Sequence, residues 1–201
     1  MIKKFSYIPL LCLTASAVFA QETPAEMKSL ITAEVIEEIK GWAKSDVVRL
    51  SVDAQNQQRG RLSEAEIEAL DKQWRDERDG ESKPLIAATI SSPLSSFLLR
   101  RQARSAGLYT EIFVVDANGL NVGQSSITDD YWQGDEAKFQ KTFSVGPGAI
   151  FIDEPEYDRA LNIWKSQVSM TLTDQSESEA IGAMTVEINL TELSRRRAPA
   201  L

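Results

Sequence analysis

Two long β-type stretches near the C-terminal end, the first of which alternates apolar and polar residues, restrict the chain to folds with an antiparallel sheet. The first stretch runs from Leu161 to Leu172 and the second from Ala180 to Leu190. Alternation with a period of two is typical of strands that bury one face. The polar segment Thr173 to Glu179 between them is too short for a parallel crossover, so the two strands are predicted to pair antiparallel.

Three shorter stretches complete a predicted sheet of five strands. Tyr109 to Val115 and Leu120 to Ser126 flank Asp116-Ala-Asn-Gly119, a hairpin signal in which the glycine is expected to have a positive φ. A break at Pro147-Gly148 precedes the third stretch, Ala149 to Asp153. With helices in the N-terminal half, the expected fold class is α+β, with helices mainly on one face of the sheet.

The segment from Pro24 to about Gln58 is predicted to form one long helix, because its apolar residues recur every three or four positions. Roughly 35 residues at about 1.5 Å each would make a rod on the order of 50 Å, longer than a small sheet can cover. We therefore expect a homodimer through this helix; the alternative is an overhang that frays in solution. The expected stripe consists of Met27, Ile31, Val35, Ile39, Trp42 or Ala43, Val47, Leu50 and Ala54.

Three further helices are predicted from their start signals. Ser63-Glu-Ala-Glu66 is a capping box that opens a helix to about Arg78. Ser92-Pro93 opens another that ends near Ser105. A short helix is expected over Asp135 to Thr142.

Composition narrows the possible functions. The chain has no histidine, and its one cysteine is Cys12, so nucleophile–histidine pairs and zinc or copper sites are not expected. Residues 1–20 are predicted to be a signal peptide cleaved before Gln21, which would place the mature protein in the periplasm. The net charge of −8 disfavours nucleic acid and anionic lipid as partners.

Two acidic segments with aromatic residues carry a family resemblance. The first is Thr128-Asp-Asp-Tyr-Trp-Gln-Gly-Asp-Glu-Ala-Lys-Phe-Gln140 and the second is Phe151-Ile-Asp-Glu-Pro-Glu-Tyr-Asp158. Together they resemble the extracytoplasmic PAS-like sensor domains known as Cache or PDC sensors, over Glu111 to Leu193. The resemblance implies a PAS-like five-stranded antiparallel sheet. The expected organisation is a long helix over residues 21–60 and a single Cache domain over residues 61–201.

The resemblance also implies a ligand site on the polar sheet face, under the segment between the second and third strands. On that basis the expected ligand is a small polar molecule, either an amine, an amino acid or a carboxylate. One alternative is a solvated sheet face with aromatics that merely pack the loop, and an inward-turned Arg100, Arg101 or Arg104 would favour an acidic ligand. The expected ligand-binding residues are Tyr131, Trp132, Asp130, Asp153, Gln167 and Ser169.

The function that these expectations favour is a stand-alone sensor module that signals through a membrane receptor kinase or cyclase. A ligand-free, dimeric interaction subunit of such a receptor is the second hypothesis. A hydrolase that uses paired carboxylates is a remote third, because no motif positions a nucleophile or base. No catalytic residue, cofactor or metal is expected; the loop acids do not have the spacing of a calcium loop.

Overall fold

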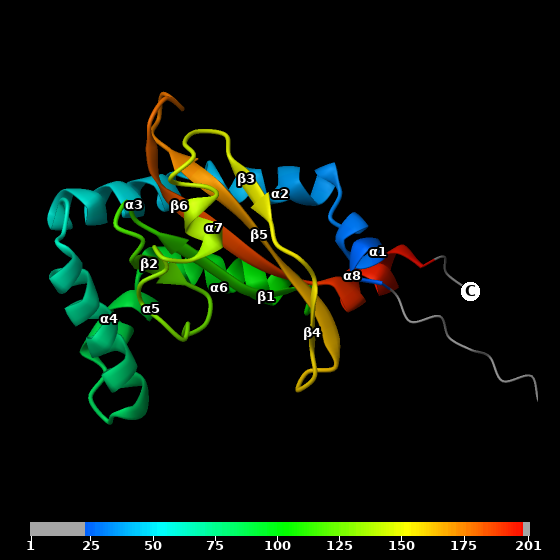
Figure 1. Ribbon diagram of the computed structural model, residues 1–201, viewed down its shortest axis with the longest axis horizontal. Coiled ribbons are helices and arrows are strands. Elements are labelled where there is room, and N and C mark those ends of the chain that lie inside the picture. Colours follow the sequence, from blue (N-terminus) through cyan, green and yellow to red (C-terminus); the bar gives the residue numbers. More distant parts are fainter. Residues whose placement is uncertain (1–22, 199–201) are drawn as a thin grey trace, which may run out of the picture.

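The computed structural model describes residues 23–198, so the signal peptide and its cleavage before Gln21 lie outside the described residues (Figure 1). The described part contains eight helices and six strands. In chain order they are α1 (Pro24–Ser29), α2 (Ala33–Ala43), α3 (Asp46–Arg59), α4 (Glu64–Asp79), α5 (Pro84–Ile90), α6 (Pro93–Arg104), β1 (Tyr109–Val115), β2 (Asn121–Gln124), α7 (Ala137–Gln140), β3 (Ile150–Ile152), β4 (Glu156–Asp158), β5 (Ile163–Thr173), β6 (Ala180–Asn189) and α8 (Leu190–Arg197).

The strands form one antiparallel sheet in the order β2-β1-β6-β5-β3, and this confirms the predicted α+β class with a PAS-like sheet. The five predicted strands are all present, and β4 is an additional short strand that pairs with the start of β5. The β1–β2 hairpin turns as predicted, with Gly119 at φ 79°. Gly182 on β6 allows a close approach, since a Cβ there would lie 2.1 Å from the Val115 carbonyl oxygen.

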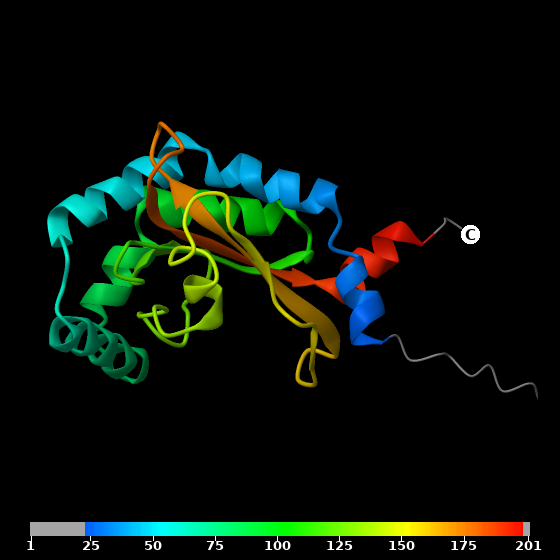
Figure 2. The ribbon, with the colours of Figure 1, turned by 45° about the horizontal axis from the view of Figure 1, so that its top comes forward.

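Helices cover one face of the sheet, and the segment containing α7 crosses the other (Figure 1). On the helical face lie α2, α3 and α6, which Figure 2 shows running along the strands. At the β2 edge, α4 and α5 form a separate unit, whereas α1 and α8 pack together at the opposite end of the molecule. The prediction that helices lie mainly on one face is therefore confirmed.

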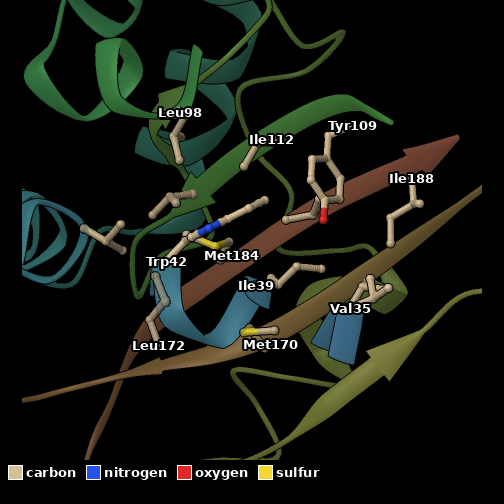
Figure 3. Packing of buried hydrophobic residues seen from close by; sticks show 14 of the residues in the cluster. Val35, Ile39, Trp42, Leu98, Tyr109, Ile112, Met170, Leu172, Met184 and Ile188 are labelled. Atoms are coloured by element: carbon tan, nitrogen blue, oxygen red, sulfur yellow. The ribbon is translucent and has the colours of Figure 1, made fainter. Parts of the chain in front are cut away.

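The main core lies between the helices and the sheet (Figure 3). Trp42 of α2 meets Tyr109 of β1 edge to face, with ring centroids 5.0 Å apart. The sheet contributes the apolar side of the predicted alternation, with Met170 and Leu172 on β5 and Met184 on β6. The residues Met27, Ile31, Val35, Ile39 and Trp42 of the predicted stripe all belong to this core.

The prediction of one long N-terminal helix is wrong, because the segment is broken twice. Thr32 and Ser45 adopt extended backbone angles and begin new helices as N-cap residues. Serine and threonine favour that position because their short polar side chains compete with helical hydrogen bonds. The second break also moves the buried face of α3 to Val48 and Val52, and Leu50 is 62% exposed.

These breaks remove the premise of the predicted homodimer. The premise was an apolar stripe too long for one domain to bury, but three shorter helices follow the domain and bury most of the apolar residues of the stripe within it. Residues 23–59 thus supply core side chains to the same cluster as the sheet. No helix of the described chain is long and apolar enough to span a membrane.

Two short helices were missed by the sequence analysis. Pro84–Ile90 forms α5, which carries the buried Ile86, and the segment after β6 forms α8. Helix α8 begins where the Asn189 side chain accepts a hydrogen bond from the backbone N–H of Glu192. The Glu192 carboxylate also pairs with Arg195 and Arg196. Arg195, Arg196 and Arg197 therefore form the last turn of α8.

Candidate functional site

The face of the sheet opposite the helices carries cross-strand rows of side chains. Glu111 on β1 is directly opposite Glu187 on β6, which is opposite Gln167 on β5. The backbone N–H of Asp153 donates to the Gln167 carbonyl, at 2.9 Å, and continues this row beyond β3. Residues that pair directly point to the same side of a sheet. The sequence therefore builds a polar row, Asp153–Gln167–Glu187–Glu111, which we call the acidic row.

Glu187 lies at the centre of the acidic row, and its side chain is 13% exposed. Its Oε1 accepts a hydrogen bond from the Thr110 hydroxyl at 2.7 Å, and its Oε2 lies 3.3 Å from Lys165 Nζ. The β1–β6 register shifts between Tyr109 and Glu111, and this irregularity lets both Thr110 and Glu111 approach Glu187. Such a carboxylate is held in place but keeps acceptor capacity for a further partner.

Glu111 is the carboxyl whose environment most opposes ionisation. Burial raises its pKa above the ordinary value of 4.5, and the neighbouring carboxylates of Glu187 and Asp129 raise it further. A hydrogen bond from the Ser126 hydroxyl, at 3.0 Å, and the charge of Lys138 act in the opposite direction. A carboxylate whose charged form destabilises the fold is typical of residues that take part in binding or catalysis.

Two lysines flank the acidic row. Lys165 lies among Glu156, Asp158 and Glu187, at 3.3, 3.5 and 3.3 Å, and is 20% exposed. Lys138, on α7, has only 11% of its side chain exposed, and its Nζ lies 5.2 Å from the centroid of the Phe113 ring. The face therefore offers several carboxylates and two positioned ammonium groups.

The neighbouring rows of side chains on the same face of the sheet are buried, and we call them the sealed part. Ser169 and Thr185 face each other across β5 and β6, with 3.0 Å between their hydroxyl oxygens, and both are buried. Phe139 of α7 packs with Val115 and Ala183 over the following row. The segment between the second and third strands thus covers the sheet as expected, but the aromatic side chains it places there include Phe139 rather than Tyr131 and Trp132.

Tyr131 and Trp132 lie instead between the sheet edge and α4. Tyr131 is 1% exposed and stacks on Trp74 with ring centroids 5.0 Å apart, and its hydroxyl accepts a hydrogen bond from Arg59 at 2.8 Å. The Asp71 carboxylate accepts from the backbone N–H groups of both Tyr131 and Trp132, at 2.9 and 3.0 Å. These two aromatics therefore pack the loop against α4, and not onto the polar face of the sheet.

The other predicted residues divide between the two regions. Asp130 is half exposed beside Arg75 of α4, with 3.6 Å between the charged atoms, so it lies with Tyr131. Asp153 and Gln167 lie in the acidic row, and Ser169 is in the sealed part. Arg101 lies over Trp42 and Phe97 on the helical side of the sheet, away from this face.

Glu111, Glu187 and Lys138 were missed by the sequence analysis, although a signal for two of them was present. Glu187 interrupts the apolar run around Val186 and Ile188, and Glu111 precedes a similar run on β1. A charged residue inside a strand, next to buried neighbours, indicates a role in ligand binding or in an ion pair. Among residues 23–198 no group of three or more acidic side chains is arranged to hold a metal ion.

Glu111→Gln is expected to stabilise the unliganded protein at neutral pH. Since the folded-state pKa of Glu111 is raised, its contribution to stability is present below the unfolded-state pKa and is lost as the pH rises through the folded-state value. The glutamine removes that loss and keeps an acceptor for Ser126. Thermal melts at pH 4 and pH 7 should show the variant gaining over wild type only at the higher pH. Equal gains at both values, or a loss at pH 7, would contradict this assignment.

The sheet order and the single layer of covering helices define the class: this is the PAS-like fold of extracellular sensor domains, also called the Cache or PDC fold. The extracellular domain of vpHK1S-Z8, a proposed histidine kinase, superimposes with a TM-score of 0.50 at 12% identity, over 86% of this chain and 57% of that one. No family model and no curated protein matches the sequence.

Two further superpositions have lower TM-scores. The sensor domain of the V. cholerae histidine kinase DctB gives a TM-score of 0.40 at 10% identity, over 88% of this chain and 59% of that one. The ligand-binding domain of the C. jejuni chemoreceptor Tlp3 gives 0.40 at 14% identity, over 84% and 66%. The chain spans less than two thirds of each of these three domains. At 12% identity, the likeness to the vpHK1S-Z8 domain concerns the fold alone.

Proposed function

We propose that this protein is a small-molecule-binding sensor module whose ligand carries an ammonium group and binds on the acidic row. The observation that carries the proposal is the direct cross-strand pairing of Glu111 on β1 with Glu187 on the central strand β6. Like charges directly opposite one another destabilise a sheet. An ammonium group placed between the two carboxylates would remove that repulsion. Ligand binding would therefore also stabilise the fold.

The flanking lysines refine the ligand class. Lys165 and Lys138 offer cationic partners on either side of the acidic row, and each already has a carboxylate neighbour. A ligand with both an ammonium and a carboxylate group, such as an amino acid, could use the acidic row for the first and a lysine for the second. A simple amine would use the acidic row alone, and a ligand that is only a carboxylate fits this face least well.

The module would act in the periplasm through a membrane partner such as a receptor kinase or cyclase. Support comes from the predicted signal peptide and from the extracellular sensor fold. The chain termini of the described part also leave from one end of the molecule, where α1 and α8 pack together (Figure 1). The acidic row lies close to that end, because Glu187 is two residues before Asn189, the N-cap of α8, and Glu154, next to Asp153, pairs with Lys28 of α1.

One observation favours the alternative of a ligand-free interaction subunit. The Ser169 and Thr185 hydroxyls hydrogen-bond to each other, and Phe139 covers the neighbouring row of side chains. This part of the face therefore has no polar group that requires a ligand as its partner.

A thermal-shift panel of amino acids, amines and carboxylates separates the two functions. A ligand present at 100 times its Kd stabilises by about 2.7 kcal/mol, a shift of roughly 5–10 °C for a domain of this size. Shifts confined to ammonium compounds support the sensor, and a panel without hits supports the interaction subunit.

A further inference from the structure

A hollow lies between the helices and the β3 edge of the sheet, and none of the acidic-row residues belongs to its lining. It is a groove of about 610 Å³ between the α2–α3 junction and the edge strand β3, and the end of β5 contributes to its lining. Figure 3 shows part of this region, with α2 next to Met170 and Leu172 of β5. The volume lies within the range of small-molecule sites, about 300–1,000 Å³.

Apolar residues from three elements line this groove. Ala43 comes from α2, Ile150 from β3, and Met170 and Leu172 from β5. Met170 and Leu172 are almost fully buried, and Ile150 is partly buried against the same core. The groove thus borders the packed interior, and a short hydrocarbon chain would contact mainly the partly exposed Ala43 and Ile150.

The charged lining of the groove is mainly cationic. Lys40 is on α2, Lys44 is the C-cap residue that follows this helix, and Arg49 is on α3. Of the two carboxylates in the lining, Asp174 is occupied by its own turn, where it accepts from the backbone N–H groups of Ser178 and Glu179. The other, Glu177, pairs with Lys44 at 2.6 Å.

The ion pairs at the groove can be exchanged for a ligand. Lys44 and Glu177 are 65% and 63% exposed, and the partner of Arg49 is Asp46, which is 80% exposed. Exposed pairs of this kind contribute only about 0–1 kcal/mol. A ligand carboxylate could therefore replace Glu177 on Lys44 at little cost.

From the apolar lining and the three cations we infer that this groove binds a small amphiphilic carboxylate, with its hydrocarbon part on Ala43 and Ile150 and its carboxylate at Lys44 and Arg49. This site is separate from the acidic row and would take the opposite charge. Glu177 then acts as an internal competitor for Lys44. Removal of Glu177 should tighten binding, whereas removal of either cation should weaken it.

The test is calorimetric titration of the full mature protein with octanoate, and with neutral octanamide as the matched probe. Lys44→Gln and Arg49→Gln should each weaken octanoate binding by about twofold to fivefold, and Glu177→Gln should tighten it by a similar factor. Lys72→Gln is the control, because Lys72 makes a similar exposed ion pair on α4, far from the groove in the chain. Octanamide should bind more weakly than octanoate.

Three results would overturn the inference. The first is no octanoate binding at millimolar concentration, and the second is equal affinity for octanoate and octanamide. The third is a Glu177→Gln variant that weakens binding or leaves it unchanged. Glu187→Gln should bind octanoate with the affinity of wild type. A failure of the groove proposal can therefore be distinguished from a failure of the proposed sensor site.

Discussion

Trp74→Ala is expected to lower the melting temperature by about 10 °C, more than any other single replacement considered for this protein. The indole is fully buried, stacks on Tyr131, and donates from Nε1 to the Thr128 carbonyl at 3.0 Å. Replacing a buried tryptophan with alanine costs about 3–5 kcal/mol in lost burial and residual cavity. At roughly 2–4 °C for each kcal/mol, a domain of this size should melt far earlier.

The effect should extend beyond stability, because Trp74 belongs to a small cluster outside the main core. Its buried partners are Ile86, Leu120 and Tyr131, which join α4, α5 and the β1–β2 edge. Faster amide exchange is therefore expected in these elements before the rest of the sheet opens. Leu161→Ala is the control, since Leu161 is 62% exposed. A melting shift for Trp74→Ala no larger than that of the control would show that the cluster is not a structural unit.

Asp71→Ala is expected to have the second largest effect. Asp71 is 7% exposed, and one of its oxygens accepts from the backbone N–H groups of Tyr131 and Trp132. Each buried donor left without a partner costs about 1–3 kcal/mol, so the loss should be on the order of 2–5 kcal/mol. Chemical denaturation of the variant measures this loss directly.

Two further variants separate the backbone contacts of Asp71 from its ion pair with Arg75. Asp71→Asn keeps an acceptor for the two N–H groups but removes the charge facing Arg75. It should recover most of the stability lost in Asp71→Ala. Asp76→Ala on the same helix removes only an exposed pair with Lys72 and should be nearly neutral. If Asp71→Asn is as destabilised as Asp71→Ala, the ion pair carries the effect and the backbone contacts do not.

Local signals in the sequence were sufficient for most of the fold. The alternation in β5 depends only on side-chain direction, and the structure confirms it, with Val168, Met170 and Leu172 in the core. The capping box at Ser63 was also confirmed, with the Glu66 carboxylate accepting from the Ser63 backbone N–H at 2.8 Å. In each case the residues that form the sequence pattern also make the interactions that determine the local structure.

The N-terminal helix could not be predicted correctly, because its breaks depend on the surface beneath it. Thr32 and Ser45 are tolerated inside exposed helices, and they become N-caps here where the chain bends to follow the sheet. Helix α5 was missed for a related reason. Its seven residues, Pro84–Ile90, are too few to form a helix without the tertiary contacts of Ile86.

Half of the candidate site was also beyond sequence reasoning. Gln167 and Asp153 follow from alternation and strand order, and both lie in the acidic row. Which surface Tyr131 packs against is decided by Trp74 and Asp71, more than fifty residues earlier in the chain. The pairing of Glu111 with Glu187 requires the β1–β6 register, which no local pattern supplies.

The most direct measurement is the affinity of the best ammonium compound from the panel for wild type, Glu187→Gln and Glu177→Gln. Each replacement removes one carboxylate, but only Glu187 lies in the acidic row, whereas Glu177 lines the groove between the helices and the β3 edge of the sheet. Loss of a hydrogen-bonded charge contact costs about 1.5–3 kcal/mol, so Glu187→Gln should weaken binding about tenfold or more. Glu177→Gln should leave the affinity unchanged, and the N-acetylated form of the ligand should not bind. Unchanged affinity in Glu187→Gln would contradict the acidic row as the binding site.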